Sequence, residues 1–525
     1  MKKISKKHIA EIILSVFLFM QILLIIYTNF FLMEANIDCD SAKLFVHAVE
    51  MWRNKTPIIP DWLTITTLEL DCSTLLAVPL FGVTRDIFLS YAIANIILLL
   101  VLIATIFYLF QKENNRIYAL ISAILICIPY RIGMLDYFNM LYFNGAQYII
   151  KVTIPLMLLA LITHSESFLN CKKDKVEFII FNIIFSIFLF TSCLSSGLYI
   201  ILCGILPVIL GSFLWRVFKN NKISIGYIIV ITETMLAAGI GYGLNHFLNI
   251  GSKGNSMQLC NIYDGLTDNI SSCFLGIFEV FGGVAYTETA AMSTEGINIL
   301  LRLIFVWMFL ICALVTAVKF LKKQAQELSV LLLLIFVWNF FILCVCDIRY
   351  GAGTFEYRYH LIGLIPLICL STKELVDWIK NYRRTLQIGI VVCATMFVGI
   401  LMVTSYKAIF EKEDRNEAHR EICAYAEEMG VDYVYFLYES EAPEICRAID
   451  YENALYLQLM DGGITWVYDY YAQYEHVPMI QENFIIVCDN GIYDFGDQME
   501  MFGYIFARSR IIGTKSIYEV TGFAE

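Results

Sequence analysis

The sequence predicts a mainly α-helical, polytopic membrane protein with about eleven transmembrane helices and a small C-terminal α/β extracytoplasmic domain. Of its 525 residues, 59% are hydrophobic and only 16% are charged, which excludes a soluble enzyme. Several apolar runs reach about 20 residues, the length that crosses a hydrocarbon core. The charge is unevenly distributed: the segment 406–525 holds 8 basic and 23 acidic residues, against 29 and 25 in the segment 1–405. A weakly basic membrane part therefore precedes an acidic soluble part, and no nucleic-acid partner is expected.

The first apolar run, 12–33, follows four lysines, as a signal peptide would. It is too long for the apolar region of a signal peptide, and no small-residue cleavage site follows it. We expect an uncleaved first helix with its N-terminus in the cytoplasm. Ten further spans are predicted, at 87–110, 117–135, 146–163, 177–195, 198–218, 223–248, 297–320, 327–346, 360–377 and 385–405.

The loops that lie inside on this count are all basic, as cytoplasmic loops are. Together with the N-terminus they hold 18 lysines and arginines, and they span residues 111–116, 164–177, 216–222, 319–326 and 378–384. The pattern predicts a cytoplasmic N-terminus and an extracytoplasmic C-terminus. It depends on a tight turn at 195–197, because a missed break there would invert everything downstream.

The first outer loop, 34–86, carries the candidate site. Asp40 or Ser41 is suited to cap a helix whose apolar residues recur at three- and four-residue spacing. Glu50 would lie almost three turns beyond Asp40, near the same face. The sequence thus predicts a short amphipathic helix with an acidic start, lying on the membrane just outside the first span.

This loop resembles the first outer loop of the GT-C class of polytopic glycosyltransferases that use lipid-linked sugars, such as the aminoarabinose transferase and protein mannosyltransferase types. The positions that match in register are Asp40, Ala42, Ala48, Glu50 and Met51. The glutamate that usually follows the aspartate is Ser41 here, so no role is carried over to that position. Later in the chain Arg358, Tyr359 and Pro366 resemble the Arg-Tyr pair that GT-C enzymes place before a late, proline-containing span. Both stretches fall on the outer face, where they could close on one pocket.

The resemblance implies that Asp40 is the catalytic base, with Asp38 and Glu50 as further candidate catalytic residues. Sugar transfer from a polyprenyl phosphate needs a carboxylate that takes the acceptor proton. Asp38 could assist Asp40 or join it in holding a divalent cation, Mg²⁺ or Mn²⁺, through hard oxygen ligands. The alternative is that Asp40 only caps a surface helix.

The leaving phosphate needs positive charge, so basic residues at the outer helix ends are candidate donor-phosphate ligands. They are Arg358 with Tyr359, Arg302, Lys151 and Arg131. Each is equally suited to anchor its helix at the membrane interface.

Glu233 lies in the middle of a predicted span, where a carboxylate is costly unless it is protonated or paired. A proton relay and an interhelical hydrogen bond both fit. Cys39 with Cys72, and Cys260 with Cys273, could form disulfides, although free thiols fit equally well.

The tail reads as an α/β domain. Helices are expected at 408–429 and 443–449, and strands at 432–438, 464–468, 484–488 and 516–520.

Together with this topology, the resemblance to the GT-C class implies a multi-pass glycosyltransferase of a bacterial plasma membrane. It would transfer a sugar from a polyprenyl-phosphate donor to a cell-envelope acceptor at the outer face, with membrane lipid around it. The alternative is a transporter or flippase for an envelope lipid or glycan precursor, for which Glu233 would be the main intramembrane polar group.

Overall fold

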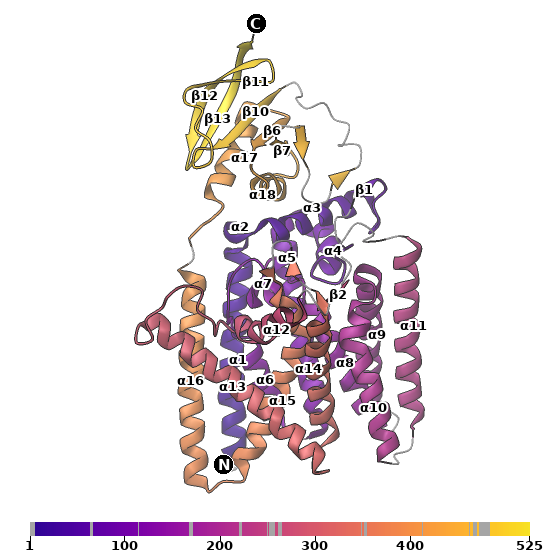
Figure 1. Cartoon of the computed structure of the whole chain (residues 1–525). Coiled ribbons are helices and arrows are strands. Elements are labelled where there is room, and N and C mark those ends of the chain that lie inside the picture. The colour runs from indigo at the N-terminus through magenta and orange to yellow at the C-terminus, as the bar shows by residue number, and fades with distance from the viewer. Residues whose placement is uncertain are drawn as a thin grey trace, which may run out of the picture.

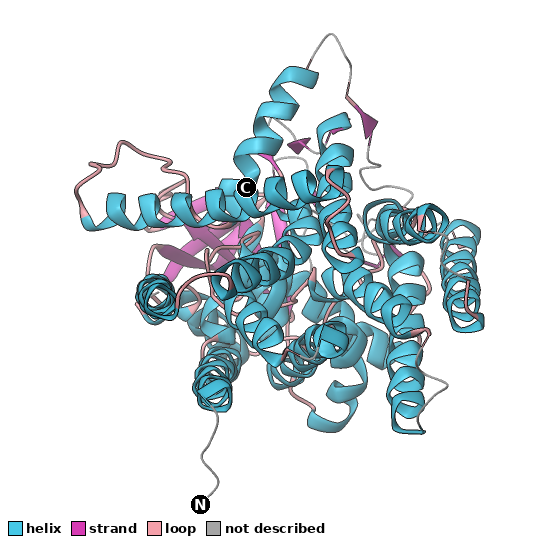
Figure 2. Cartoon of the chain, turned by 90° about the horizontal axis from the view of Figure 1, so that it is seen from below, coloured by secondary structure: helices cyan, strands magenta, loops and turns pink. Residues whose placement is uncertain are grey.

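The computed structural model describes residues 6–63, 67–113, 115–166, 172–219, 223–248, 250, 258–260, 265–347, 349–350, 354–411, 413–460, 463–465, 470–471 and 483–524. Long helices stand side by side in one part of the molecule, and a small sheet caps one end of them (Figure 1). We call this end the sheet end and the opposite end, where the N-terminus lies, the N-terminal end. Seen from below, many of the helices are viewed close to their axes (Figure 2).

The helices of the described chain are α1 (Lys6–Phe31), α2 (Met33–Asn36), α3 (Cys39–Asn54), α4 (Thr74–Thr84), α5 (Ile87–Phe110), α6 (Arg116–Ile126), α7 (Tyr137–Tyr142), α8 (Ile149–His164), α9 (Lys172–Ser196), α10 (Leu206–Phe218), α11 (Ile225–Phe247), α12 (Leu266–Val280), α13 (Thr294–Leu321), α14 (Glu327–Val345), α15 (Leu361–Lys380), α16 (Arg384–Phe410), α17 (Glu417–Met429) and α18 (Glu441–Ile449). Short 3-10 helices are η1 (Gln111–Glu113) and η3 (Tyr357–His360), and η2 (Ile201–Ile205) is a π-helix.

The strands are β1 (Trp62–Leu63), β2 (Gln258–Leu259), β3 (Cys346–Asp347), β4 (Arg349–Tyr350), β5 (Thr354–Phe355), β6 (Tyr433–Leu437), β7 (Leu455–Met460), β8 (Gly463–Thr465), β9 (Tyr470–Tyr471), β10 (Phe484–Asp489), β11 (Gln498–Met501), β12 (Tyr504–Ile512) and β13 (Lys515–Phe523).

The prediction of a mainly helical membrane protein with a C-terminal sheet region is confirmed. Each of the eleven predicted spans coincides with a helix. Within the described residues, eight helical segments are long and apolar enough to cross a membrane: α1, α5, α9, η2 with α10, α11, α13, α14 and α16. The other three predicted spans correspond to α6 and α8, which are shorter, and to α15, which carries four charged residues near its end. The count of eleven therefore stays a prediction.

Two predicted spans differ in detail from the helices observed. The span 117–135 is wrong in its second half, because α6 ends at Ile126 and the chain continues irregularly through Pro129. Proline has no N–H to donate, which favours a helix ending before it. The span 198–218 begins as the π-helix η2. The tight turn at 195–197 is present: α9 ends at Ser196, and Gly197 has a φ of +60°.

The C-terminal region contains a seven-stranded sheet in the order β11-β12-β13-β10-β6-β7-β8. The central strand β6 pairs in parallel with β10 and β7, and the outer strands pair in antiparallel fashion. Apolar residues of α17 and α18 pack on one side of these strands.

The predicted strands at 432–438, 484–488 and 516–520 and the helix at 443–449 are confirmed. Only 464–465 of the strand predicted at 464–468 lies in the described chain, and it belongs to β8. The predicted helix at 408–429 is wrong in its first part, because α16 continues to Phe410 and α17 begins at Glu417.

The helix α3 lies across the sheet end of the long helices, beneath α18 (Figure 1). Eleven of its sixteen residues are buried, so it is an internal element and not the membrane-surface helix that its amphipathic pattern predicts. The strand β1, which follows α3, pairs with β9 of the C-terminal region. The Asn416 side-chain amide donates to the carbonyl oxygens of Glu34 (2.9 Å) and Ile37 (3.0 Å), just before α3. The C-terminal region therefore holds α3 from both of its ends.

Candidate functional site

The cap of α3 is Asp38, and neither Asp40 nor Ser41 fills that role. The backbone N–H of Ser41 donates to Asp38 Oδ1 (2.8 Å), and Asp38 has the extended backbone of an N-cap residue. The other oxygen, Oδ2, accepts from the side-chain amides of Asn139 (3.2 Å) and Asn144 (3.3 Å). Asp38 is thus fully engaged in holding the start of α3 against the loops around α7. The prediction that Asp40 or Ser41 is the cap is wrong, because both lie inside the first turn of the helix.

Asp40 occupies the first turn of α3 and is half-buried. Its carboxylate makes no hydrogen bond or ion pair with any residue that the structure describes. The positive end of the helix dipole stabilises a negative charge at this position. Asp40 is therefore a carboxylate with no partner in the described chain. Asp38, two residues earlier, accepts three hydrogen bonds that hold the start of the helix.

The charge of Asp40 acts on two groups of the segment before α15. Glu356 Oε2 pairs with Arg358 Nε at 2.6 Å, and both side chains are largely buried. Burial raises the pKa of Glu356, and the nearby Asp40 carboxylate adds to this rise. Burial alone would lower the pKa of Arg358, but Tyr148, Glu356, Tyr359 and Asp40 together hold it above its usual value. The structure thus brings Asp40 and Arg358, which are over 300 residues apart in sequence, into one electrostatic neighbourhood.

Aromatic rings extend this neighbourhood. The Arg358 guanidinium lies 5.7 Å from the centre of the Tyr359 ring, which is 6.1 Å from the ring of Tyr148 and 5.6 Å from that of Tyr199. The Lys151 ammonium lies 5.2 Å from the Tyr148 ring. Arg358, Tyr359 and Lys151 therefore meet around Tyr148.

Two lysines near the site are already paired. Lys151 Nζ lies 3.0 Å from Asp71 Oδ1, and the Asp71 side chain is fully buried. Lys43, one turn after Asp40 on α3, pairs with Glu69 Oε1 at 3.0 Å. The charge of Lys151, a predicted phosphate ligand, is thus neutralised by the first outer loop.

Glu50 lies near the opposite end of α3 from Asp40. Its Oε1 accepts from Arg53 Nη1 (2.7 Å), and its Oε2 accepts from the Tyr471 hydroxyl (2.6 Å) of the C-terminal region. Three turns of helix separate it from Asp40, and its oxygens are engaged in a contact that docks α3. The structure therefore does not bring Glu50 together with Asp38 and Asp40.

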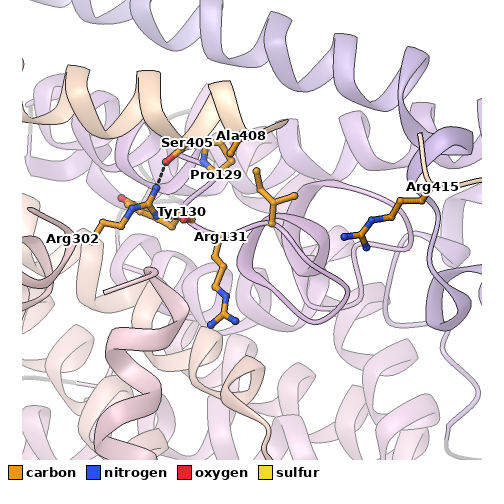
Figure 3. Close-up of a pocket in the computed structure, with 8 residues that line it drawn as sticks. Pro129, Tyr130, Arg131, Arg302, Ser405, Ala408 and Arg415 are labelled. Atoms are coloured by element: carbon orange, nitrogen blue, oxygen red, sulfur yellow. Dashed lines mark hydrogen bonds between the residues drawn. The ribbon is translucent and has the colours of Figure 1, made fainter. Parts of the chain in front are cut away.

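The remaining two predicted ligands, Arg131 and Arg302, line a separate cavity of about 220 Å³ (Figure 3). Its lining residues are Pro129, Tyr130, Arg131, Ile132, Arg302, Ser405, Ala408 and Arg415, and they include none of Asp38, Asp40 or Arg358. Arg131 Nε pairs with Asp136 Oδ1 at 3.0 Å, and its guanidinium lies over the rings of Tyr286 and Tyr357.

The donor set around Asp38 and Asp40 does not fit a divalent cation. Such ions take six or more oxygen ligands, and the two Asp38 oxygens already accept three N–H groups. Within the described ranges, no group of three or more Asp, Glu, His or Cys side chains is placed to hold a metal ion.

Several residues of the site were not singled out by the sequence: Lys43, Glu69, Asp71, Tyr148, Tyr199 and Glu356. Two of them had a usable signal, because Lys43 lies three residues after Asp40 on one helix and Glu356 lies two before Arg358. The others come from segments whose proximity no local pattern encodes.

The remaining open alternatives are resolved by the contacts observed. Glu233 on α11 accepts hydrogen bonds from Asn182 and from Ser186 (2.8 Å), both on α9, so it makes an interhelical contact. Cys39, Cys72, Cys260 and Cys273 are reduced cysteines in the structure, so neither of the two disulfides is formed.

No protein-family model matches this chain, and none of the curated proteins does. Two solved structures, both of the Archaeoglobus fulgidus oligosaccharyltransferase, are similar to it. One, tethered with an acceptor peptide containing the NVT sequon via a disulfide bond, is 12% identical with a TM-score of 0.46, and the likeness covers 83% of this chain and 63% of that one. The other, a complex with Zn and sulfate, is 13% identical with a TM-score of 0.49, and the likeness covers 90% of this chain and 68% of that one. This chain thus spans about two thirds of the length of those structures, and at this level the likeness says nothing about donor or acceptor.

Proposed function

We propose that the protein is a membrane glycosyltransferase of the GT-C type, which transfers a sugar from a polyprenyl-phosphate donor to a cell-envelope acceptor. The sheet end would face away from the cytoplasm, in a bacterial plasma membrane. The observation that supports the proposal is the electrostatic effect of the Asp40 carboxylate, which has no partner in the described chain, on the buried guanidinium of Arg358. Sugar transfer from a phosphate donor requires a carboxylate that takes the acceptor proton and a cation that stabilises the leaving phosphate.

In the proposed reaction Asp40 takes the proton of an acceptor hydroxyl as its oxygen attacks the anomeric carbon of the sugar. The bond from that carbon to the phosphate oxygen breaks, and the lipid phosphate leaves with the electron pair. An attack opposite to the leaving group inverts the configuration at the anomeric carbon. Asp38 does not take part in the proton transfer, because its oxygens hold the start of α3 in place.

Arg358 is the proposed ligand of the departing phosphate. Its present partner, Glu356, has a pKa that burial raises. A phosphate dianion would compete well for the same guanidinium, because charge-assisted pairs to phosphate are strong and can be bidentate. Tyr359 and Tyr148 are placed to border the sugar or the phosphate beside it. Lys151 is proposed only as a secondary contributor, since Asp71 neutralises it.

The transporter alternative receives no support from the contacts around Glu233. That carboxylate is satisfied by Asn182 and Ser186 of the neighbouring helix, so it does not line a free polar path. No divalent cation is included in the proposal, because the donor set at Asp38 and Asp40 does not fit one.

The proposal is tested in cells that lack the protein and are complemented with the wild type or with Asp40→Asn. Mass spectrometry of the envelope glycans and of the lipid-linked sugars is the measurement. Both the empty strain and the Asp40→Asn strain are expected to lose one sugar from a glycan and to accumulate the lipid-linked form. Glycans that are the same in all three strains would refute glycosyl transfer.

A further inference from the structure

The cavity that Arg131, Arg302 and Arg415 line contains three cations and no carboxylate among its eight lining residues (Figure 3). It lies apart from Asp40 and Arg358, and the proposed reaction makes no use of it. Four segments contribute to it: the loop after α6, α13, α16 and the link from α16 to α17.

Arg302 is the group that makes this cavity unusual. Its side chain on α13 is only 6% exposed, and it pairs with no carboxylate of the described chain. Its partners are neutral: Nη1 donates to the carbonyl oxygens of Tyr130 and Phe281, Nη2 to Ser405 Oγ (2.8 Å), and Nε to Asn298 Oδ1 (3.4 Å). Neutral acceptors orient a guanidinium without cancelling its charge. A buried charge that no opposite charge compensates is costly, so a counter-ion is expected at this place.

The backbone around Arg302 is shaped to hold this guanidinium. Gly282 has a φ of +69°, and a Cβ there would lie 3.0 Å from Arg302 Nη1. Any side chain at this position would crowd the guanidinium and strain the turn. The surrounding chain therefore fixes the arginine close to the cavity wall.

The other two arginines add charge around the same space. Arg131 keeps Asp136 as its counter-ion, whereas Arg415 is exposed and pairs with no carboxylate in the described ranges. The backbone N–H of Arg415 donates to Ala35 O (3.0 Å), which fixes its position beside the start of α3. Two of the three cations are thus uncompensated.

We propose that this cavity binds the phosphate group of a membrane lipid. Arginine clusters are suited to phosphate, whose oxygens accept several N–H groups at once. A lipid is favoured over a free ion because Ser405 and Ala408 belong to α16, whose apolar side chains are largely exposed along the helix and would face lipid tails. The inference does not depend on the proposed glycosyl transfer.

The test uses the full chain purified in a neutral detergent. Three probes are titrated and followed by native mass spectrometry and by the unfolding temperature: dioctanoyl phosphatidylglycerol, inorganic phosphate and dioctanoylglycerol, which lacks the phosphate. The variants are Arg302→Gln and Arg415→Gln. The matched control is Lys407→Gln, which removes an exposed α16 cation that is paired with Glu411 and lies outside the cavity lining.

We expect the phospholipid to bind the wild type and Lys407→Gln equally, and to bind each arginine variant about 10-fold more weakly. Arg415→Gln keeps the test decisive if Arg302→Gln does not fold, because the Arg415 side chain is exposed. Dioctanoylglycerol should not bind at the site.

Inorganic phosphate that binds as tightly as the phospholipid would assign the site to a free ion and overturn the proposal of a lipid ligand. Equal phospholipid affinity in the wild type and both arginine variants would remove the site altogether. Asp40→Asn should bind the phospholipid normally, so this result and the test of glycosyl transfer are independent.

Discussion

The N-terminal end and the sheet end of the long helices differ in how their charged side chains are paired. At the N-terminal end, cations and carboxylates pair across helices: Lys319 of α13 with Glu374 of α15, and Arg216 of α10 with Glu166 after α8. Lys373, whose side chain is 2% exposed, pairs with Asp377 at 3.1 Å and lies 3.8 Å from Glu113. The first two pairs connect neighbouring helices, and the buried cations Arg216 and Lys373 both have a carboxylate partner.

At the sheet end, paired and unpaired charges lie next to each other. Lys43, Lys151 and Arg131 each pair with a carboxylate. In the described chain, Asp40 pairs with no cation, and Arg302 and Arg415 pair with no carboxylate. An uncompensated charge that is buried costs stability, so the buried Arg302 indicates a ligand that compensates its charge. The two ends thus differ in their buried cations. Arg216 and Lys373 pair with carboxylates of the protein, whereas Arg302 has no carboxylate in the described chain, so a ligand is expected beside it.

The largest effect is expected for Asp40→Asn. The substitution keeps the size of the side chain and leaves the Asp38 cap intact, but it removes the proposed base. Transfer by the purified protein should fall about 10²–10⁴-fold. Asp38→Asn is the matched control, because asparagine also caps helices well and transfer should survive. Full transfer by Asp40→Asn would end the assignment of this residue.

The next effect is expected for Arg358→Ala. Losing the proposed charge-assisted contact to the donor phosphate should lower kcat/KM for the donor about 10- to 100-fold. Arg358→Lys should recover part of the loss, since it restores the charge without the planar fork. Kinetics with a polyprenyl-phosphate sugar are the measurement. Unchanged donor kinetics in both variants would move the phosphate site away from this residue.

A smaller effect is expected for Asn416→Ala, which removes the two hydrogen bonds that the Asn416 side chain donates to the chain before α3. A shifted Asp40 should lower kcat a few-fold while KM for the donor is unchanged. Asn453→Ala is the control, because among the described residues the Asn453 side chain bonds only to Asp450, in its own loop. Equal kcat in the two variants would show that α3 does not need this contact.

At the N-terminal end, Lys319→Met should affect stability alone. It leaves the buried Glu374 without its cation, but Lys319 is partly exposed, so the cost should be about 1 kcal/mol. The unfolding temperature should drop slightly, and transfer per folded molecule should not change. The double variant Lys319→Met/Glu374→Leu should recover the stability. A loss of transfer without a loss of stability would contradict the contrast between the ends.

The smallest effect concerns the pH dependence of Asp38. Burial raises its pKa in the folded protein to about 6, from 3.8. The folded state then binds the proton more tightly than the unfolded state, so the contribution of this group to stability is complete below pH 3.8 and is lost as the pH rises to about 6. The unfolding temperature of the wild type minus that of Asp38→Asn should therefore fall over this interval. A difference that rises with pH would contradict the burial of Asp38.

The helices were predictable from the sequence because hydropathy is a local property, and each predicted span corresponds to a helix. The failures have physical causes. The helix α6 stops before Pro129, which hydropathy does not register. Two aspartates, Asp38 and Asp40, both suit a cap, and only the extended backbone of Asp38 decides between them. In the C-terminal region β7, β11 and β12 were not predicted, since short mixed strands carry weak periodicity.

The site was predictable only where its residues sit in recognisable patterns, as Asp40 and Arg358 do. The electrostatic effect of Asp40 on Arg358 depends on the tertiary fold, which brings α3 toward the segment before α15. The neutralisation of Lys151 by Asp71 and the isolation of Arg302 are likewise tertiary facts. The sequence therefore does not show which of the basic residues pair with a carboxylate, because this pairing depends on the tertiary structure.

The pairing of β1 with β9 has a consequence for how the molecule is made. Trp62 lies opposite Tyr471, about 400 residues later in the chain, and Asn416 reaches back to Ile37. Synthesis runs from the N-terminus, so the helix that carries Asp40 is among the first segments made and the groups that fix it are among the last. A nascent chain halted before Asn416 would hold most of its helices with α3 unfastened. The order of synthesis thus leaves the helix that carries Asp40 unfixed at its two ends until the last part of the chain has been made.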